Sequence, residues 1–156
     1  MKGNKQVIEV LNQILRKELT GINQYFIHAK MCDNWGYVKL KKFIWDESIG
    51  EMKHADKIIE RILFLEGTPN ITDYDKIKIG ATVKQQLESD LGLEIAALTV
   101  LRPGIKKCLE ASDDASRELL EHILVDEEKH VDWIETQLHQ IAEVGYQNYL
   151  AQQIDD

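Results

Sequence analysis

Apolar residues recur at steps of three and four along almost the whole chain, which is the spacing of one face of an α-helix. The pattern is interrupted around Asn34-Trp35-Gly36, from Gly67 to Gly80, at Ser112-Asp113-Asp114 and at Gly145. Glycine, proline and capping residues stand at these places, and such residues begin or end helices. The sequence therefore predicts four long helices and a short fifth, over about 5–35, 38–66, 82–111, 115–144 and 146–154.

The lengths of the connections predict how these helices are arranged. Short turns make the first helix antiparallel to the second and the third antiparallel to the fourth, whereas residues 70–80 form a long crossover. The predicted fold is all-α: a four-helix bundle with one long crossover and a short fifth C-terminal helix. A chain of 156 residues has the size of a single domain, 1–156, and can bury a core without disulfides.

Charge and cysteine usage exclude several classes of partner. The chain has 19 Lys+Arg against 27 Asp+Glu and a net charge of −8, so it lacks the cationic character that nucleic-acid binding requires. We expect no secretory signal and no membrane span, because no stretch approaches the roughly 20 apolar residues that a span needs. Cys32 and Cys108 stand alone, as reduced thiols do in the cytosol. A cytoplasmic protein is expected.

Six ionisable residues occupy positions where the helical pattern calls for apolar side chains. Glu18 lies between Ile14 and Ile22, for example, on the same face of the first helix. Side chains at such positions point into the core of a bundle. The six residues are Glu18, Glu51, His54, Glu94, Glu127 and His130.

Their spacing is duplicated. Glu51 follows Glu18 by 33 residues, and Glu127 follows Glu94 by the same interval. Each second glutamate opens a Glu-x-x-His, in Glu51-Met52-Lys53-His54 and in Glu127-Glu128-Lys129-His130. One such tetrapeptide is common on a solvated helix. Two copies in core register, each with a partner glutamate at one offset, indicate a shared binding site.

The ligand types indicate what this site binds. Four buried carboxylates cannot remain ionised alone, because an isolated buried charge costs many kcal/mol. Two divalent cations balance four carboxylates, and carboxylate with imidazole suits iron or manganese. One Glu from each of two helices and a Glu-x-x-His from each of the other two is the ligand arrangement of di-iron carboxylate bundles. The sequence predicts a di-iron centre inside one bundle.

At these residues the sequence resembles the bacterioferritins, within the wider ferritin-like family, over essentially its whole length. The matching segments are Met1-Lys2-Gly3, Gly21-Ile22-Asn23-Gln24-Tyr25-Phe26, Glu51-Met52-Lys53-His54-Ala55-Asp56, Ile62-Leu63-Phe64-Leu65-Glu66-Gly67, Asp126-Glu127-Glu128, His130, Asp132-Trp133 and Gln147-Asn148-Tyr149-Leu150. The resemblance implies a ferritin-like bundle and a ferroxidase that oxidises Fe(II) with oxygen or hydrogen peroxide. It also implies iron storage in a hollow shell of 24 subunits, built from two-fold dimers, with a ferredoxin-type reductase for iron release.

The resemblance further assigns the ligands. It implies that Glu51 and Glu127 bridge the two irons. Glu18 and His54 would complete one coordination sphere, while Glu94 and His130 would complete the other. Haem b is implied between paired subunits.

Met52 is predicted to hold that haem. It lies about 100° around the helix from Glu51, on a second stripe with Trp45, Ile59 and Leu63 that a two-fold partner would cover. The stripe alone favours a methionine that packs in a dimer interface. The resemblance, with Met52 inside the Glu51 to His54 motif, favours one thioether on each side of the haem iron.

Four further residues are candidates for a supporting role. Tyr25 and Trp133 lie near the predicted ligands. Each is a candidate to donate an electron or to hydrogen-bond a ligand, and packing in the core is the alternative. Asp90 and Asp126 are candidates to orient the ligating imidazoles.

Other residues are interpreted as lying outside the centre. His28, His122 and His139 fall off the ligand register and are predicted to be surface or interface histidines. Asp46 and Gly50 stand where some family members carry a His and an acidic residue, so the chain lacks the pair from which those members build an inner-surface iron site, and the sequence leaves open whether it has such a site.

Three alternatives are less well supported. A rubrerythrin-like di-iron peroxidase or oxidase without mineral storage usually adds a thiolate iron module, and the chain has no Cys-x-x-Cys. A starvation-type mini-ferritin places its metal site between subunits. A non-catalytic helical interaction module leaves six ionisable core residues unexplained.

Overall fold

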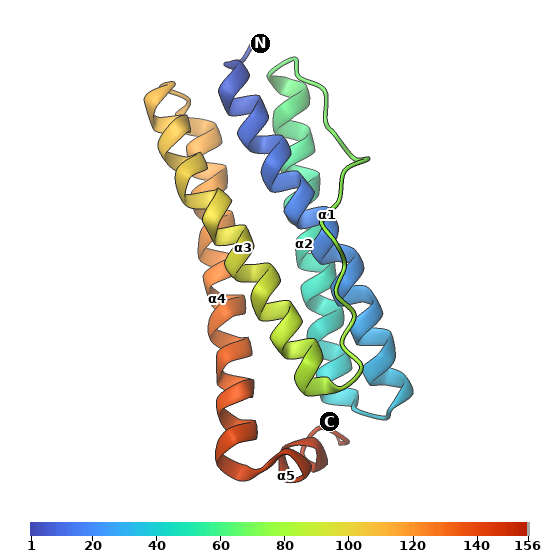
Figure 1. Cartoon of the computed structure of the whole chain (residues 1–156). Coiled ribbons are helices and arrows are strands. Elements are labelled where there is room, and N and C mark those ends of the chain that lie inside the picture. Colours follow the sequence, from blue (N-terminus) through green and yellow to red (C-terminus); the bar gives the residue numbers. More distant parts are fainter. Residues whose placement is uncertain (156) are drawn as a thin grey trace.

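The computed structural model, which describes residues 1–155, contains four long helices and a short fifth (Figure 1). They are α1 (Lys5–Asn34), α2 (Val38–Phe64), α3 (Val83–Glu110), α4 (Asp114–Val144) and α5 (Tyr146–Ala151). No strand occurs within these described residues. The predicted all-α, ferritin-like bundle is confirmed, and the predicted helix ends differ from the observed ones by at most three residues.

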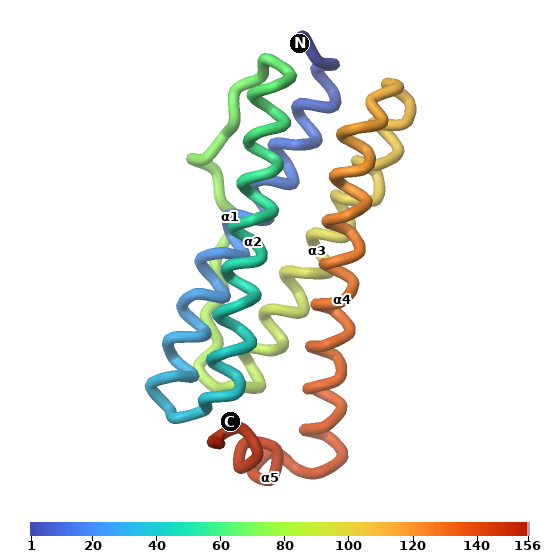
Figure 2. Tube along the Cα trace, turned by 180° about the vertical axis from the view of Figure 1, so that it is seen from behind, coloured from blue at the N-terminus to red at the C-terminus, as the bar shows by residue number. Residues whose placement is uncertain are grey.

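The helices form two antiparallel pairs, α1 with α2 and α3 with α4 (Figure 2). Residues 65–82 return along the full length of the first pair, so α3 runs parallel to α2 and antiparallel to α1 (Figure 1). This return is the predicted crossover. The short α5 lies across the end of the bundle below α4.

Side-chain caps begin three of the long helices. Asn4 accepts hydrogen bonds from the backbone N–H groups of Gln6 and Val7 ahead of α1. Thr82 caps α3 and Asp113 caps α4 in the same way. Such caps satisfy N–H groups that have no partner inside the helix, which fixes where each helix starts.

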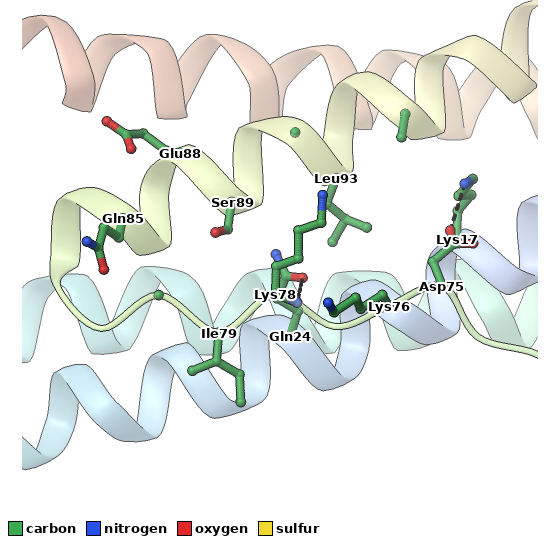
Figure 3. Close-up of a pocket in the computed structure, with 13 residues that line it drawn as sticks. Lys17, Gln24, Asp75, Lys76, Lys78, Ile79, Gln85, Glu88, Ser89 and Leu93 are labelled. Carbon is green, nitrogen blue, oxygen red and sulfur yellow. Dashed lines mark hydrogen bonds and ion pairs between the residues drawn. The ribbon is translucent and has the colours of Figure 1, made fainter.

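The crossover is tied to α1 by polar contacts. Asp75 forms ion pairs with Arg16, at 2.8 Å, and with Lys17, at 2.6 Å. Further along, the backbone N–H of Lys78 donates to Oε1 of Gln24 at 3.1 Å (Figure 3). These bonds hold an irregular segment against one face of α1 and so cover side chains that helix periodicity alone leaves exposed.

Two apolar clusters fill the bundle at different heights. One joins residues such as Leu11, Ile58 and Leu120, and the other joins residues such as Leu40 and Leu87. The six predicted ligands lie on the four long helices, and on each of these helices they stand between residues of one cluster and residues of the other. The apolar core is therefore interrupted by one polar layer, whose side chains the packing on both sides holds in place.

None of the helices in residues 1–155 combines the length and the apolar character needed to cross a membrane.

Candidate metal centre

Each of the four long helices contributes one or two side chains to the polar layer. Glu18 comes from α1 and Glu94 from α3, while α2 and α4 each contribute a Glu and a His. The four carboxylate residues are at most 3% exposed. The side chains of His54 and His130 are 10% and 13% exposed. Water therefore has little access to these charges, and they interact strongly with one another.

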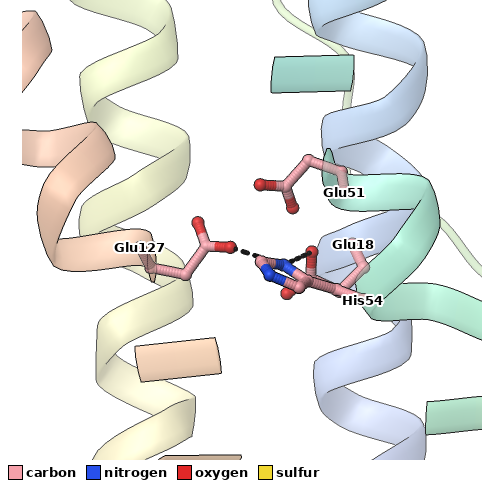
Figure 4. A group of neighbouring side chains, drawn as sticks. All are labelled: Glu18, Glu51, His54 and Glu127. Carbon is pink, nitrogen blue, oxygen red and sulfur yellow. Dashed lines mark hydrogen bonds and ion pairs between the residues drawn. The ribbon is translucent and has the colours of Figure 1, made fainter. Parts of the chain in front are cut away.

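The six side chains converge into two overlapping groups of four. In each group, one ligand atom per residue lies within 4.8 Å of the others. The groups are Glu18, Glu51, His54 and Glu127, and Glu51, Glu94, Glu127 and His130. Figure 4 shows the first group, with Glu51 and Glu127 reaching toward one another from opposite helices. Because these two glutamates belong to both groups, they have the position required of bridging ligands.

His54 faces the carboxylates with one ring nitrogen and is held by the other. Its Nδ1 lies 3.3 Å from Glu18 Oε2 and 3.1 Å from Glu127 Oε1. Its Nε2 lies 2.8 Å from Asp126 Oδ2. Asp126 thus occupies the orienting position suggested for it, and Nδ1 is the atom left for a metal.

His130 is held in the same way by a residue that sequence reasoning missed. Its Nδ1 lies 3.4 Å from Glu51 Oε1 and 3.5 Å from Glu94 Oε1. Its Nε2 contacts Oε2 of Glu47. Glu47 stands one helical turn before Glu51 on α2, and this i, i+4 spacing is the signal that could have identified it.

The electrostatics of the layer favour bound protons or bound cations. Burial, together with the charge of Glu127, raises the pKa of Glu94 to about 8. Burial, with Glu127 again adding to it, raises the pKa of Glu18 well above its ordinary value. Burial lowers the pKa of His54, but its contacts with Glu127 and other acidic groups outweigh burial and raise that pKa to about 9.

Unpartnered oxygen atoms support a metal pair. Oε1 of Glu18 and Oε2 of Glu94 are buried without a hydrogen-bond partner among the described residues. Buried polar atoms are normally satisfied, so such atoms call for an ion or a water molecule. One belongs to each group, and oxygen with imidazole is a donor set that iron accepts.

Tyr25 and Trp133 differ in their contacts. The Oη of Tyr25 donates a hydrogen bond to Oε1 of Glu94, and burial raises the pKa of this phenol well above its ordinary value. The ring of Trp133 stacks on Phe43, with centroids 3.7 Å apart and planes inclined by 10°. Tyr25 therefore contacts a predicted ligand directly, whereas Trp133 packs beside the layer.

Two interpretations of side chains near the centre are corrected by the structure. His28 is not a surface residue, because it is fully buried beneath the crossover. Asp90 binds His28 Nδ1 at 2.9 Å and Gln24 Nε2 at 2.8 Å, so its hydrogen bonds do not go to a predicted ligand. Neither arrangement was predicted because the crossover covers this face of α1, and a segment without periodicity gives no sign of where it packs.

The other residues that the sequence placed outside the centre lie at or near the surface. His122 and His139 are exposed, as predicted. Asp46 is exposed, and a Cβ placed at Gly50 would meet no atom within 4 Å.

Met52 lies on an uncovered apolar surface of α1 and α2. It is 53% exposed, and Leu63 is 59% exposed on the same helix. Phe26 of α1 is 47% exposed and packs against the ring of Trp45, with centroids 5.6 Å apart. An accessible thioether beside apolar and aromatic side chains is a surface that suits an apolar ring ligand or a second chain.

The fold and the polar layer define the class of protein. Residues 8–144 match the family model described as a ferritin-like domain. Among similar curated proteins, bacterioferritin BfrA of Mycobacterium tuberculosis is 46% identical over 152 residues, which cover 97% of this chain and 96% of the relative. The bacterioferritin of Rhodobacter capsulatus is 46% identical over 149 residues, covering 96% and 92%. The chain belongs to the bacterioferritins.

Proposed function

We propose that the chain is a cytoplasmic iron storage protein with ferroxidase activity. It oxidises Fe(II) to Fe(III) at the six converging residues and stores the ferric product in a hollow shell of 24 subunits. The observation that carries the proposal is the buried polar layer, in which Glu51 and Glu127 belong to both ligand groups. The names of the relatives support it.

The residues of the chain contribute charge balance and orientation. Four carboxylates offset the four positive charges of two Fe(II) ions, which lowers the cost of bringing both ions into the core. His54 and His130 direct Nδ1 toward the ions because Asp126 and Glu47 hold Nε2. Two Fe(II) ions then supply the two electrons that reduce dioxygen to hydrogen peroxide, or hydrogen peroxide to water.

The storage part of the proposal is tested by mass and iron content. We expect the purified protein to elute with the mass of about 24 chains of 18.0 kDa and to retain ferric iron after aerobic loading. Such a shell would carry a large negative charge that attracts cations. A monomer or dimer that oxidises Fe(II) and retains none would instead support the rubrerythrin-like alternative. Iron release by a ferredoxin-type reductase belongs to the same proposal.

Haem binding at Met52 is the second part. The exposed thioether of Met52 fits a soft ligand for haem iron, and a two-fold partner would supply the opposite one. Protein from a haem-sufficient host is expected to show a low-spin b-type spectrum, at up to one haem per two chains. Met52→Leu should erase this spectrum while the oxidation of Fe(II) continues. Met31→Leu, the matched control on α1, should leave it unchanged. Unchanged bands in Met52→Leu would assign the haem to another residue.

A further inference from the structure

A small cavity lies beside the metal centre. Its volume is about 10 Å³, which is room for about one water molecule. The stacked rings of Phe43 and Trp133 form part of its wall. Its polar lining comes from all four long helices: Tyr25 of α1, Glu47 of α2, Asp90 of α3 and His130 of α4. A buried water needs two to four polar partners, and this lining supplies them.

Two hydrogen bonds hold the side chain of Asp90 in place. It is 2% exposed, and its Oδ1 accepts hydrogen bonds from Gln24 Nε2 and His28 Nδ1. The backbone N–H of Gly80 donates to His28 Nε2 at 3.0 Å. That nitrogen must therefore lack a proton, so His28 is neutral and acts on Asp90 only as a donor. Among the described residues both bonds end on Oδ1, which leaves Oδ2 for a molecule in the cavity.

This environment makes Asp90 a stronger base than a carboxylate in water. Burial raises its pKa, with the nearby charge of Glu94 adding to that effect, and these outweigh the hydrogen bonds from His28 and Gln24. The titratable groups that share its cavity are Tyr25, Glu47 and His130. A carboxylate with a raised pKa accepts a proton more readily than a carboxylate in water.

We infer that Asp90 accepts a proton from the metal centre through one water molecule held in this cavity. The inference rests on the proposed ferroxidase function, because oxidation produces Fe(III), which acidifies water bound to it. One O–H bond of that water breaks, and its proton passes to the cavity water. The cavity water in turn gives one of its own protons to Oδ2 of Asp90. Hydroxide remains with the iron, and no electron moves in this step.

Asp90→Asn tests the inference, because Asn keeps an Oδ1 that accepts from Gln24 and His28 and removes only the proton acceptor. Stopped-flow mixing of Fe(II) with oxygen should show the oxidation of Fe(II) slowed by at least about tenfold, because the proton acceptor is missing. The solvent deuterium isotope effect should also change, whereas Fe(II) binding stoichiometry should not. Asp56→Asn, at an exposed position of α2, is the matched control.

The outcomes separate this inference from the function on which it rests. Wild-type protein that does not oxidise Fe(II) would overturn both. Wild-type protein that oxidises Fe(II), together with Asp90→Asn oxidising it at the same rate and with the same isotope effect, would overturn the inference alone. A high-resolution crystal structure of the metal-free protein gives a second measurement. It should contain one water in the cavity bonded to Asp90, and a dry cavity would also refute the inference.

Discussion

Alanine at Glu18, Glu94 or His130 is expected to abolish the fast oxidation of Fe(II). In the wild-type protein this phase should saturate near about two irons per chain, because the structure contains two overlapping ligand groups. Glu18 belongs to one group alone, and Glu94 and His130 belong to the other alone. Loss of either group leaves a single iron, which cannot supply both electrons to the oxidant. Removing a residue that only orients a ligand typically costs about 10- to 100-fold in activity. Removing a ligand itself is therefore expected to slow the oxidation by at least about a hundredfold.

Stopped-flow absorbance after aerobic addition of Fe(II) measures this phase, and circular dichroism checks that the helices are intact. Glu128→Ala is the matched control, since Glu128 neighbours Glu127 in sequence but is exposed on α4. It should retain the full fast phase. Retention of the phase in Glu18→Ala, Glu94→Ala and His130→Ala would rule out the proposed ligand set.

The polar layer was visible in the sequence because helix periodicity carries positional information. Glu18 interrupts an apolar stripe, and Glu51 interrupts the corresponding stripe of the second helix. A regular helix converts such spacing directly into a facing direction. The convergence of the layer followed once the order of the helices was known, and that order depended on the lengths of the connections.

Residues that act between elements were harder to identify. Glu47 acquires its role only from the contact of α2 with His130 on α4, so a pattern within one helix gave a weak signal. The burial of His28 depends on Gly80, which lies in a crossover without periodicity. Irregular backbone has no fixed relation between sequence spacing and direction, and for this reason the Asp90 environment had to be found in the structure.

Metal-free protein is expected to lose stability as pH rises from about 5 to about 8. The pKa of Glu94 is raised from 4.5 to about 8, so in this range the folded protein keeps a proton that the unfolded chain loses. The pKa of His54 is raised from 6.5 to about 9, so its contribution is complete below 6.5 and disappears as pH rises through 9. Both groups make the folded state bind more protons, and stability therefore falls with rising pH. The melting temperature in chelator, measured across this range, should decrease.

Divalent metal should reverse this trend, because a cation replaces the protons that the carboxylates otherwise hold. The rise in melting temperature on adding Co(II) or Zn(II) is expected to be larger at about pH 8 than at about pH 5, where protons compete for the same oxygens. Metal at a thousandfold excess over its Kd would add about 4 kcal/mol to the free energy of unfolding. Glu94→Gln keeps the shape of the side chain and removes its charge, so it should flatten the pH dependence in chelator and reduce the metal-induced rise. Glu128→Gln should change neither. A melting temperature that increases with pH in chelator, or a metal effect equal in Glu94→Gln and wild type, would mean that Glu94 does not belong to a metal-binding layer.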